Sequence, residues 1–305
     1  MLIKSASGWE IPESEVTPES VYMNRRQLLA TIGIGGFAAQ SMANAAAARN
    51  PAFTVPERPI TEEFAATGYN NFYEFNAEDK EAVKDLVGKF VTSPWSVTVS
   101  GLVNKPQTFD VDKLVATMPL EERVYRFRCV EAWAMTVPWT GFPMSELIKL
   151  VEPKPEAKFI KFTSAKRPDQ MPGIKKYANY HFPYYEGLRI DEAMNPLAMF
   201  ATGLYGKPLP KQNGAPIRAV LPWKYGYKGA KSIEKIEFVA KEPPTFWNDL
   251  QSAEYGFYSN VNPSKPHPRW SQASERVIPR GGRVPTKMYN GYEQWVASLY
   301  NGKES

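Results

Sequence analysis

The sequence predicts an α+β fold, because strand-like and helix-like segments are interspersed along it without a regular strand–helix–strand repeat. The 305 residues are enough for one large domain or two smaller ones. A hydrophobic content of 43% is typical of a globular protein. Frequent proline (27 residues) and aromatic residues (13%) favour a loop-rich fold over a helical bundle.

Strands are predicted where apolar residues alternate with polar ones or form short runs between turns. Five segments have this character: 95–100, 125–129, 159–163, 217–221 and 233–239. In the second of these, alternation places Tyr125, Phe127 and Cys129 on one face of the strand and two arginines on the other. Cys129 is therefore expected at the end of a strand, facing inward with two aromatic side chains just before a turn.

Three segments predict helices. Over 77–90, apolar residues at 83, 86, 87 and 90 follow helical spacing among charged residues. Residues 145–151 predict a short helix. Residues 191–205 predict a further helix that is opened or broken near Pro196.

Residues 1–45 predict an export signal rather than part of the fold. Arg25 and Arg26 precede an apolar stretch from Leu28 to Ala39, and the small residues 43–45 fit a cleavage rule. The stretch is about a dozen residues long, too short to span a bilayer of roughly 30 Å as a helix. The arginine pair resembles a twin-arginine signal, so we expect a periplasmic location; an uncleaved anchor is the alternative.

For the rest of the chain we expect an extended arm rich in Pro and Ala over 46–67, followed by one catalytic domain over 68–305. The formal charge of +5 is modest and no basic run occurs, so no nucleic-acid binding is expected. A single cysteine allows no internal disulfide. Only His181 and His267 are present, too few for a zinc or iron site built from several histidines.

Cys129 is either an inert buried thiol or a metal ligand. Free cysteines are usually buried and unreactive. However, Arg123, Arg126 and Arg128 could lower its pKa if the backbone bends there. A thiolate suits a soft metal centre. With no cluster of Cys or His beside it, the other metal ligands would have to come from a cofactor.

A second group of candidate residues lies between 203 and 231. Glycines at 214, 226 and 229 allow a ligand to approach the backbone closely. Arg218 and Lys231 could hold a phosphate, the arginine through its fork and the lysine as a point charge. The alternative is a surface of Pro/Gly turns with solvated charges, and the residues alone do not decide between the two.

Taken together, these motifs resemble the molybdopterin-binding domain of the sulfite oxidase superfamily. The segments that carry the resemblance are GKPLP (206–210), NGAPIR (213–218), PWKYG (222–226) and KGAK (228–231). RCVEAW (128–133) occupies the place of the metal-binding cysteine of that family. Six further segments are similar to the catalytic subunits of periplasmic protein-methionine-sulfoxide reductases: YNNFYEF (69–75), PLEER (119–123), DQMPG (169–173), EYGFY (254–258), HPRWSQ (267–272) and NGY (290–292).

The resemblance implies a sulfite-oxidase-type fold and a molybdenum–molybdopterin cofactor, with Cys129 as the metal ligand and catalytic residue. The cofactor contacts that it implies are Asn70, Tyr73, Glu74, Ser164, Asn213, Arg218, Gly229, Ala230 and Lys231. Ser164 departs from the threonine of the family but retains a hydroxyl. Tyr73 and Glu74 are also candidate catalytic residues that relay protons; alternatively, both only position the pterin. Trp133 and Trp223 could line an open pocket or belong to the core.

The implied activity is removal of oxygen from methionine sulfoxide residues in periplasmic proteins, with electrons from a haem-containing membrane subunit. Sulfite oxidases carry Arg-Asn-His near the first motif, whereas this chain has Tyr69-Asn70-Asn71, which argues against an anionic substrate. Reduction of small S- or N-oxides, sulfite oxidation and a non-enzymatic binding module are the alternatives. No added dimerisation domain is expected, so the resemblance implies a monomeric catalytic subunit within a heterodimer.

Overall fold

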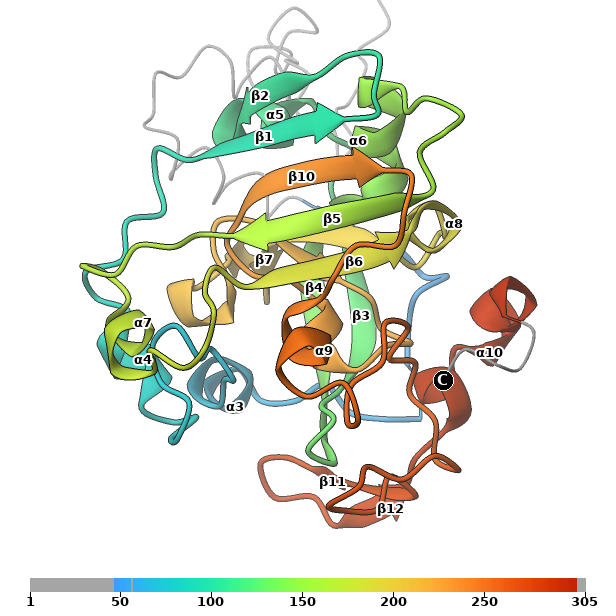
Figure 1. Ribbon diagram of the computed structural model, residues 1–305. Coiled ribbons are helices and arrows are strands. Elements are labelled where there is room, and N and C mark those ends of the chain that lie inside the picture. The colour runs from blue at the N-terminus through green and yellow to red at the C-terminus, as the bar shows by residue number, and fades with distance from the viewer. Residues whose placement is uncertain (1–46, 56, 301–305) are drawn as a thin grey trace, which may run out of the picture. The chain divides into compact units, whose positions relative to one another are not determined.

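Two mixed β-sheets form the framework of the fold (Figure 1). The computed structural model describes residues 47–55 and 57–300, so the predicted signal over 1–45 lies outside the described residues. Helices and strands are interspersed along the chain, and the predicted α+β class is confirmed. Over the described ranges, no helix is both long and apolar enough to cross a membrane.

The first sheet has five strands in the order β2-β1-β10-β5-β6. Its strands are β1 (Ser96–Gly101), β2 (Gln107–Asp110), β5 (Phe159–Ser164), β6 (Tyr185–Arg189) and β10 (Ile233–Val239). Only the β1–β10 pair is parallel. The alternating burial of β1 and β5 follows from their alternating sequences, since successive side chains of a strand point to opposite faces.

The second sheet has seven strands, in the order β12-β11-β4-β7-β8, with β3 paired to β4 and β9 paired to β7. Its strands are β3 (Glu121–Arg128), β4 (Trp133–Pro143), β7 (Met199–Leu204), β8 (Lys207–Pro208), β9 (Arg218–Val220), β11 (Ser274–Val277) and β12 (Arg283–Pro285). Both central strands, β4 and β7, are buried almost throughout, as expected of strands covered on both faces.

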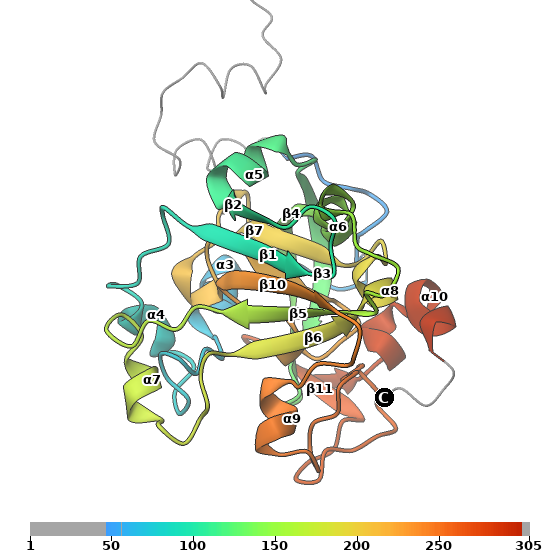
Figure 2. The same cartoon turned by 45° about the horizontal axis from the view of Figure 1, so that its top comes forward.

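The two sheets pack against each other (Figure 2), and aromatic side chains meet between them. Phe162 of β5 meets Phe200 of β7 edge-on, with ring centroids 6.1 Å apart. Phe200 also contacts Phe142 of β4 at 5.7 Å. Edge-to-face contacts of this kind stabilise a core beyond the apolar area that they bury.

Short helices and turns connect the strands. The α-helices are α3 (Glu63–Gly68), α4 (Val83–Leu86), α5 (Val111–Thr117), α6 (Met144–Val151), α7 (Pro172–Lys176), α8 (Ile190–Ala193), α9 (Phe246–Leu250) and α10 (Glu293–Val296). Single 3-10 turns are η3 (Lys211–Asn213), η4 (Gly226–Lys228), η5 (Met288–Gly291) and η6 (Ala297–Leu299). The carboxylate of Asp110 caps α5 by accepting from the backbone N–H of Lys113. The apolar residues of α6 recur at helical spacing and are buried.

All five predicted strands and the short helix at 145–151 are confirmed, but two predicted helices are wrong. Over 77–90 only α4 is helical, because the side chains of Asn76 and Asp79 accept from nearby backbone N–H groups and hold the preceding turns. Residues 191–205 divide into α8 and the strand β7. The run after Pro196 is uniformly buried, and such a run has no periodicity that separates a buried helix from a buried strand.

Residues 47–55 and 57–67 run along the edge of the second sheet. The backbone N–H of Asn50 donates to the carbonyl oxygen of Glu122, and Phe53 and Val55 are buried. Helix α3 begins at Glu63. A domain boundary at residue 67 remains a prediction.

Candidate active site

A cavity of about 850 Å³ lies between α3, the loop that follows it, the β3–β4 turn, η4 and α9. Nine of the ten site residues predicted from sequence line it: Asn70, Tyr73, Glu74, Cys129, Ser164, Asn213, Arg218, Gly229 and Lys231. Ala230 is fully buried behind the cavity wall and does not line it. The structure therefore brings together residues that are up to 161 positions apart in the sequence (70 to 231). The individual roles of these residues remain predictions.

Cys129 lies directly after β3, in the tight turn that leads into β4, as predicted. The backbone N–H of Cys129 donates to the carbonyl of Trp133 (3.0 Å), and that of Ala132 donates to the carbonyl of Cys129 (3.1 Å). Ala132 has a positive φ of 63°, a conformation that costs energy for a residue with a Cβ atom. Such strain often marks functional turns, where the surrounding structure holds it in place.

Residues from the C-terminal part of the chain anchor this turn. The guanidinium of Arg128 is fully buried, pairs with Glu275 (2.8 Å) and donates to the carbonyl oxygen of Cys129. Trp270 Nε1 and Gln272 Nε2 both donate to the carbonyl of Val130, each at 2.7 Å. Because β11 pairs in parallel with the start of β4, a segment that is remote in sequence fixes the backbone around the thiol.

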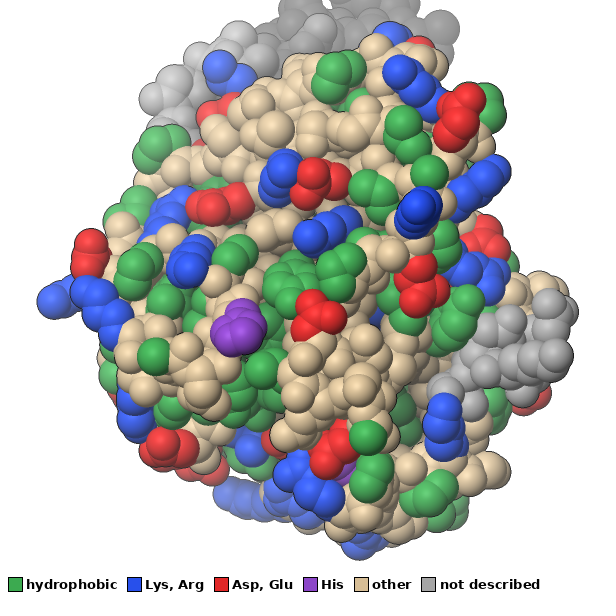
Figure 3. Space-filling view, viewed as in Figure 1, with side chains coloured by type: hydrophobic (Ala, Val, Ile, Leu, Met, Phe, Trp, Pro, Cys, Tyr) green, Lys and Arg blue, Asp and Glu red, His purple; other side chains and the backbone are tan. Residues whose placement is uncertain are grey.

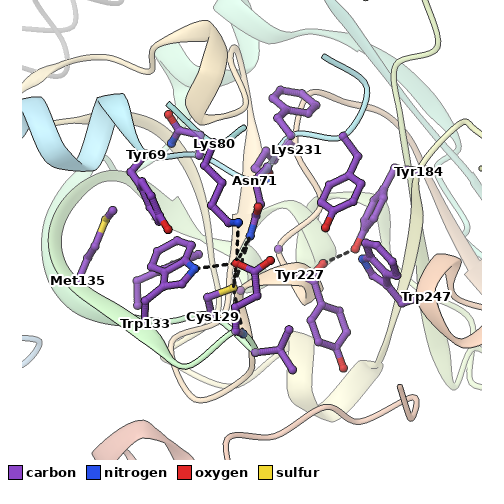
Figure 4. Close-up of a pocket in the computed structure, with 18 of the residues that line it drawn as sticks. Tyr69, Asn71, Lys80, Cys129, Trp133, Met135, Tyr184, Tyr227, Lys231 and Trp247 are labelled. Atoms are coloured by element: carbon purple, nitrogen blue, oxygen red, sulfur yellow. Dashed lines mark hydrogen bonds and ion pairs between the residues drawn. The ribbon is translucent and has the colours of Figure 1, made fainter. Parts of the chain in front are cut away.

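The Cys129 side chain faces a polar cluster in the cavity (Figure 4). Asn71 Nδ2 and the backbone N–H of Glu131 each lie 3.5 Å from its sulfur. The Glu131 carboxylate accepts from Asn71 (3.2 Å) and Trp133 Nε1 (2.9 Å), and it pairs with Lys80 (3.2 Å). These contacts fix the position of the carboxylate beside the sulfur.

The prediction that arginines lower the pKa of Cys129 is wrong. Burial, reinforced by Glu131, raises the pKa of the thiol to about 12, and Arg128 opposes this shift only in part. Arg123 and Arg126 face away from the thiol and pair with Glu121 and Glu57. A bound metal cation would reverse this balance, since coordination deprotonates a thiol.

Two cations in the cavity wall have no carboxylate partner. Over residues 47–55 and 57–300, neither Arg218 nor Lys231 lies within 4 Å of an acidic side-chain oxygen. Arg218 donates only to backbone carbonyls, and Lys231 donates to the carbonyl of Asn71 at 2.6 Å. By contrast, the buried Lys224 and Lys228 pair with glutamates at 2.5 and 2.6 Å.

Burial also shifts the pKa values of the charged groups in this wall. The pKa of Lys231 falls to about 7, mainly through burial and then through repulsion from Arg218. Burial also lowers the pKa of Arg218 to about 10. Burial raises the pKa of Glu74 to about 7, although Lys231 opposes that shift. An anion in the cavity would relieve the cost of both cations.

Three polar side chains of the wall lack partners for a buried atom. Asn70 and Asn213 both donate to the carbonyl of Ala66, and their buried Oδ1 atoms have no hydrogen-bond donor among the described residues. The buried hydroxyl of Ser164 has no partner within the same residues. Buried polar atoms are nearly always hydrogen-bonded in folded proteins, so these orphans indicate a polar ligand.

Aromatic side chains form another part of the cavity wall. Tyr73 lies against Trp247 (ring centroids 5.1 Å apart) and Tyr180 (5.7 Å), and Trp247 continues to Tyr255 (5.2 Å). Trp133 lines the cavity, as one alternative anticipated. For Trp223 the other alternative, a position in the core, is confirmed: it is fully buried and donates to the hydroxyl of Tyr300.

Sequence reasoning missed Asn71, Lys80 and Glu131 as site residues. Asn71 and Glu131 fell within the recognised motifs, and the spacing of Glu131 two positions after Cys129 was an available signal. Lys80 carried no signal, because its position depends on the irregular path of residues 76–82.

Comparison with known proteins agrees with this geometry. Residues 85–247 match the model of the oxidoreductase molybdopterin-binding domain family. Relatives named protein-methionine-sulfoxide reductase catalytic subunit MsrP align along almost their whole length. The one from Burkholderia mallei is 47% identical over 100% of this chain and 98% of its own. The one from Ralstonia nicotianae is 48% identical over 100% of this chain and 98% of its own. The one from Pseudomonas syringae pv. tomato is 46% identical, over 99% and 98%.

The chain belongs to the family of oxidoreductases with a molybdopterin-binding domain. It is therefore an oxidoreductase with the molybdopterin-binding fold, and the predicted molybdenum–molybdopterin cofactor is confirmed. Among solved structures, the sulfane dehydrogenase SoxCD from Paracoccus pantotrophus aligns with a TM-score of 0.45 and 17% identity. That alignment covers 61% of this chain and 47% of SoxCD, and it adds nothing to the family assignment.

The residues of the cavity fit the cofactor of the family. Molybdopterin carries a phosphate, which Arg218, Lys231 and the Ser164 hydroxyl can hold, and a polar pterin ring, whose N–H groups suit the free amide oxygens of Asn70 and Asn213. Across the described residues, no group of three or more His, Cys, Asp or Glu side chains could hold a metal ion. A metal held by Cys129 would therefore need a cofactor to supply its other ligands.

Proposed function

We propose that this protein is a molybdenum-dependent reductase that removes oxygen from methionine sulfoxide residues in periplasmic proteins. The observation that carries this proposal is the placement of Cys129 in an open cavity, between a wall that fits an anionic polar cofactor and a wall of aromatic side chains. The names and full-length similarity of the relatives support the substrate class.

In this proposal, Cys129 ligates the metal, while Asn70, Asn213, Arg218 and Lys231 hold the organic part of the cofactor. The bound cofactor supplies the two-electron redox chemistry. The overall reaction consumes two electrons and two protons and releases the sulfide and water.

The aromatic wall would receive the substrate side chain. A sulfoxide is neutral, and its S-methyl group favours contact with the rings of Trp133 and Trp247. Glu74 and Tyr73 are candidates to supply protons, because both line the same cavity. Of the two, Glu74 is the better acid near neutral pH, since burial raises its pKa to about 7.

The location and partners follow from the leader and from the relatives. The twin arginines ahead of a short apolar stretch support export to the periplasm. The relatives are named as catalytic subunits, which supports a complex with a further subunit. We propose a heterodimer that contains one copy of the catalytic chain. We propose that the second subunit is a haem-containing membrane protein that supplies the electrons.

Substrate comparison and ligand replacement test the proposal. Protein produced in a cofactor-competent host should contain about one molybdenum per chain and reduce oxidised protein with a reduced viologen dye as donor. Cys129→Ala should retain the fold but lose sulfoxide reduction by at least about a thousandfold. Reduction at the native rate by this variant would refute the assigned ligand, and a strong preference for sulfite would refute the substrate class.

A further inference from the structure

Two exposed arginines lie at the mouth of the cavity, on the β11–β12 hairpin. Arg276 and Arg283 both line the cavity and are directly opposite each other across the two strands. Like charges at opposite positions of a strand pair destabilise the pair, so this arrangement is unfavourable without an anion beside it. Figure 3 shows several Lys and Arg side chains at the lower edge of the molecule, where Figure 1 places this hairpin.

The hairpin directs its only carboxylate away from the mouth. Glu275 precedes Arg276 on β11, is 1% exposed and pairs inward with Arg58 and Arg128. Arg283 is oriented by two hydrogen bonds to Ser274, from Nε to the hydroxyl (3.0 Å) and from Nη2 to the carbonyl (3.1 Å). Its guanidinium is thus held in place without being neutralised.

The other two cations near the mouth are neutralised. Lys80 pairs with Glu131 at 3.2 Å. Arg269 pairs with Glu254 at 2.7 Å. In the part of the chain that the structure describes, Arg276 and Arg283 have no carboxylate within 4 Å. The mouth therefore presents two unneutralised guanidinium groups.

The backbone of Arg276 also contacts the turn that carries Cys129. Arg276 pairs with Trp133 in the β11–β4 ladder, and its backbone N–H donates to the carbonyl of Ala132 at 2.9 Å. Ala132 is three residues from Cys129. When a polypeptide inserts a methionine side chain into the cavity, the residues that flank this methionine must lie over the rim of the cavity.

We propose that Arg276 and Arg283 form a subsite for acidic side chains that flank the methionine sulfoxide in a substrate polypeptide. This inference rests on the proposed function and adds a sequence preference to it. Guanidinium groups bind carboxylates in a fork geometry, and pairs at the rim of a site set selectivity more than total affinity.

Paired peptides test the preference. Two ten-residue peptides would carry one central methionine sulfoxide, flanked on both sides either by Asp and Glu or by Asn and Gln, with a reduced viologen dye as electron donor. At low ionic strength, kcat/KM for the acidic peptide should be about five to ten times that for the neutral one. The ratio should fall towards one near 1 M salt, where the screening length is about 3 Å.

Three variants locate the effect. R276Q/R283Q should reduce the ratio to between about one and two, and R276K/R283K should keep most of it because the charges remain. Lys113 is an exposed cation on α5 that does not line the cavity, and K113Q should leave the ratio unchanged. Fluorescence anisotropy with methionine sulfone versions of the peptides measures the same preference without turnover, so it also applies to a variant that loads less cofactor.

The outcomes separate the two proposals. Equal kcat/KM for both peptides, or an unchanged ratio in R276Q/R283Q, overturns the subsite and leaves the proposed function intact. A variant that slows turnover with bacterial membranes as donor, but not with the dye, assigns the arginines to the electron donor instead and also overturns it. If molybdenum-loaded protein reduces neither peptide, the proposed function fails and this inference fails with it.

Discussion

Replacing Lys231 by methionine is expected to stabilise the cofactor-free protein and to weaken retention of the cofactor. Within the part of the chain that the structure describes, the amine has no carboxylate partner and donates to the carbonyl of Asn71. Without an anionic ligand, the protonated amine costs free energy, and with the ligand the same charge contributes to binding. The substitution should therefore have opposite effects on the two forms.

The pKa of Lys231 sets the magnitude. A fall from the usual 10.5 to about 7 lowers the free energy of unfolding by up to about 4 kcal/mol at pH 7, at 1.36 kcal/mol per pKa unit. Water in the cavity screens the charge and offsets part of this cost, so we expect a gain of about 1 to 3 kcal/mol in Lys231→Met. Since the folded-state pKa is lowered, the penalty is full below pH 7, and the gain should vanish as the pH rises to 10.5.

The assay compares protein from a host that cannot make molybdopterin with protein from a competent host. Urea unfolding gives the free energy of each form, and elemental analysis gives molybdenum per chain. Lys224 is the matched control: it is fully buried and pairs with Glu192 at 2.5 Å. Lys224→Met should destabilise both forms by about 3 to 5 kcal/mol, because it leaves a buried carboxylate unpaired.

The reasoning has two points of failure. If cofactor-free Lys231→Met loses stability as Lys224→Met does, then Lys231 stabilises the fold and is not reserved for binding an anionic ligand. If Lys231→Met gains stability but retains a full complement of molybdenum, then the cation does not contribute to cofactor binding.

Two further substitutions address the loop that faces Lys231. Glu74→Gln should stabilise the cofactor-free protein by up to about 3 kcal/mol above pH 7, since burial raises the pKa of Glu74 from 4.5 to about 7. A raised carboxyl pKa makes stability fall as the pH rises from about 4.5 to 7, so the gain should be absent at pH 4, and a gain independent of pH in urea titrations would contradict this. Gly173→Ala should cost about 1 to 3 kcal/mol and lower the molybdenum content, because its Cβ would lie 2.3 Å from the carbonyl oxygen of Tyr73. Gly88→Ala, whose Cβ meets nothing within 4 Å, is the control, and equal melting temperatures for the two variants would refute the steric argument.

The sequence by itself determined the fold class, the five predicted strands and nine of the residues that line the cavity. Alternation in 125–129 was sufficient to place Cys129 at a strand end, because the side chains of a strand have a period of two whatever surrounds them. Motif resemblance selected nine residues that share one cavity. The prediction succeeded because the residues of these short motifs are chosen for contact with a ligand and not for packing in the core.

Only the tertiary structure decided the environment of those residues. The strand β7 could not be separated from a helix, since a uniformly buried run has no polar face to reveal its period. The raised pKa of Cys129 depends on burial and on Glu131, and the anchoring of its turn depends on Arg128 and Glu275, 147 positions apart. Desolvation and ion pairing are properties of neighbours in space, so local sequence patterns do not contain them.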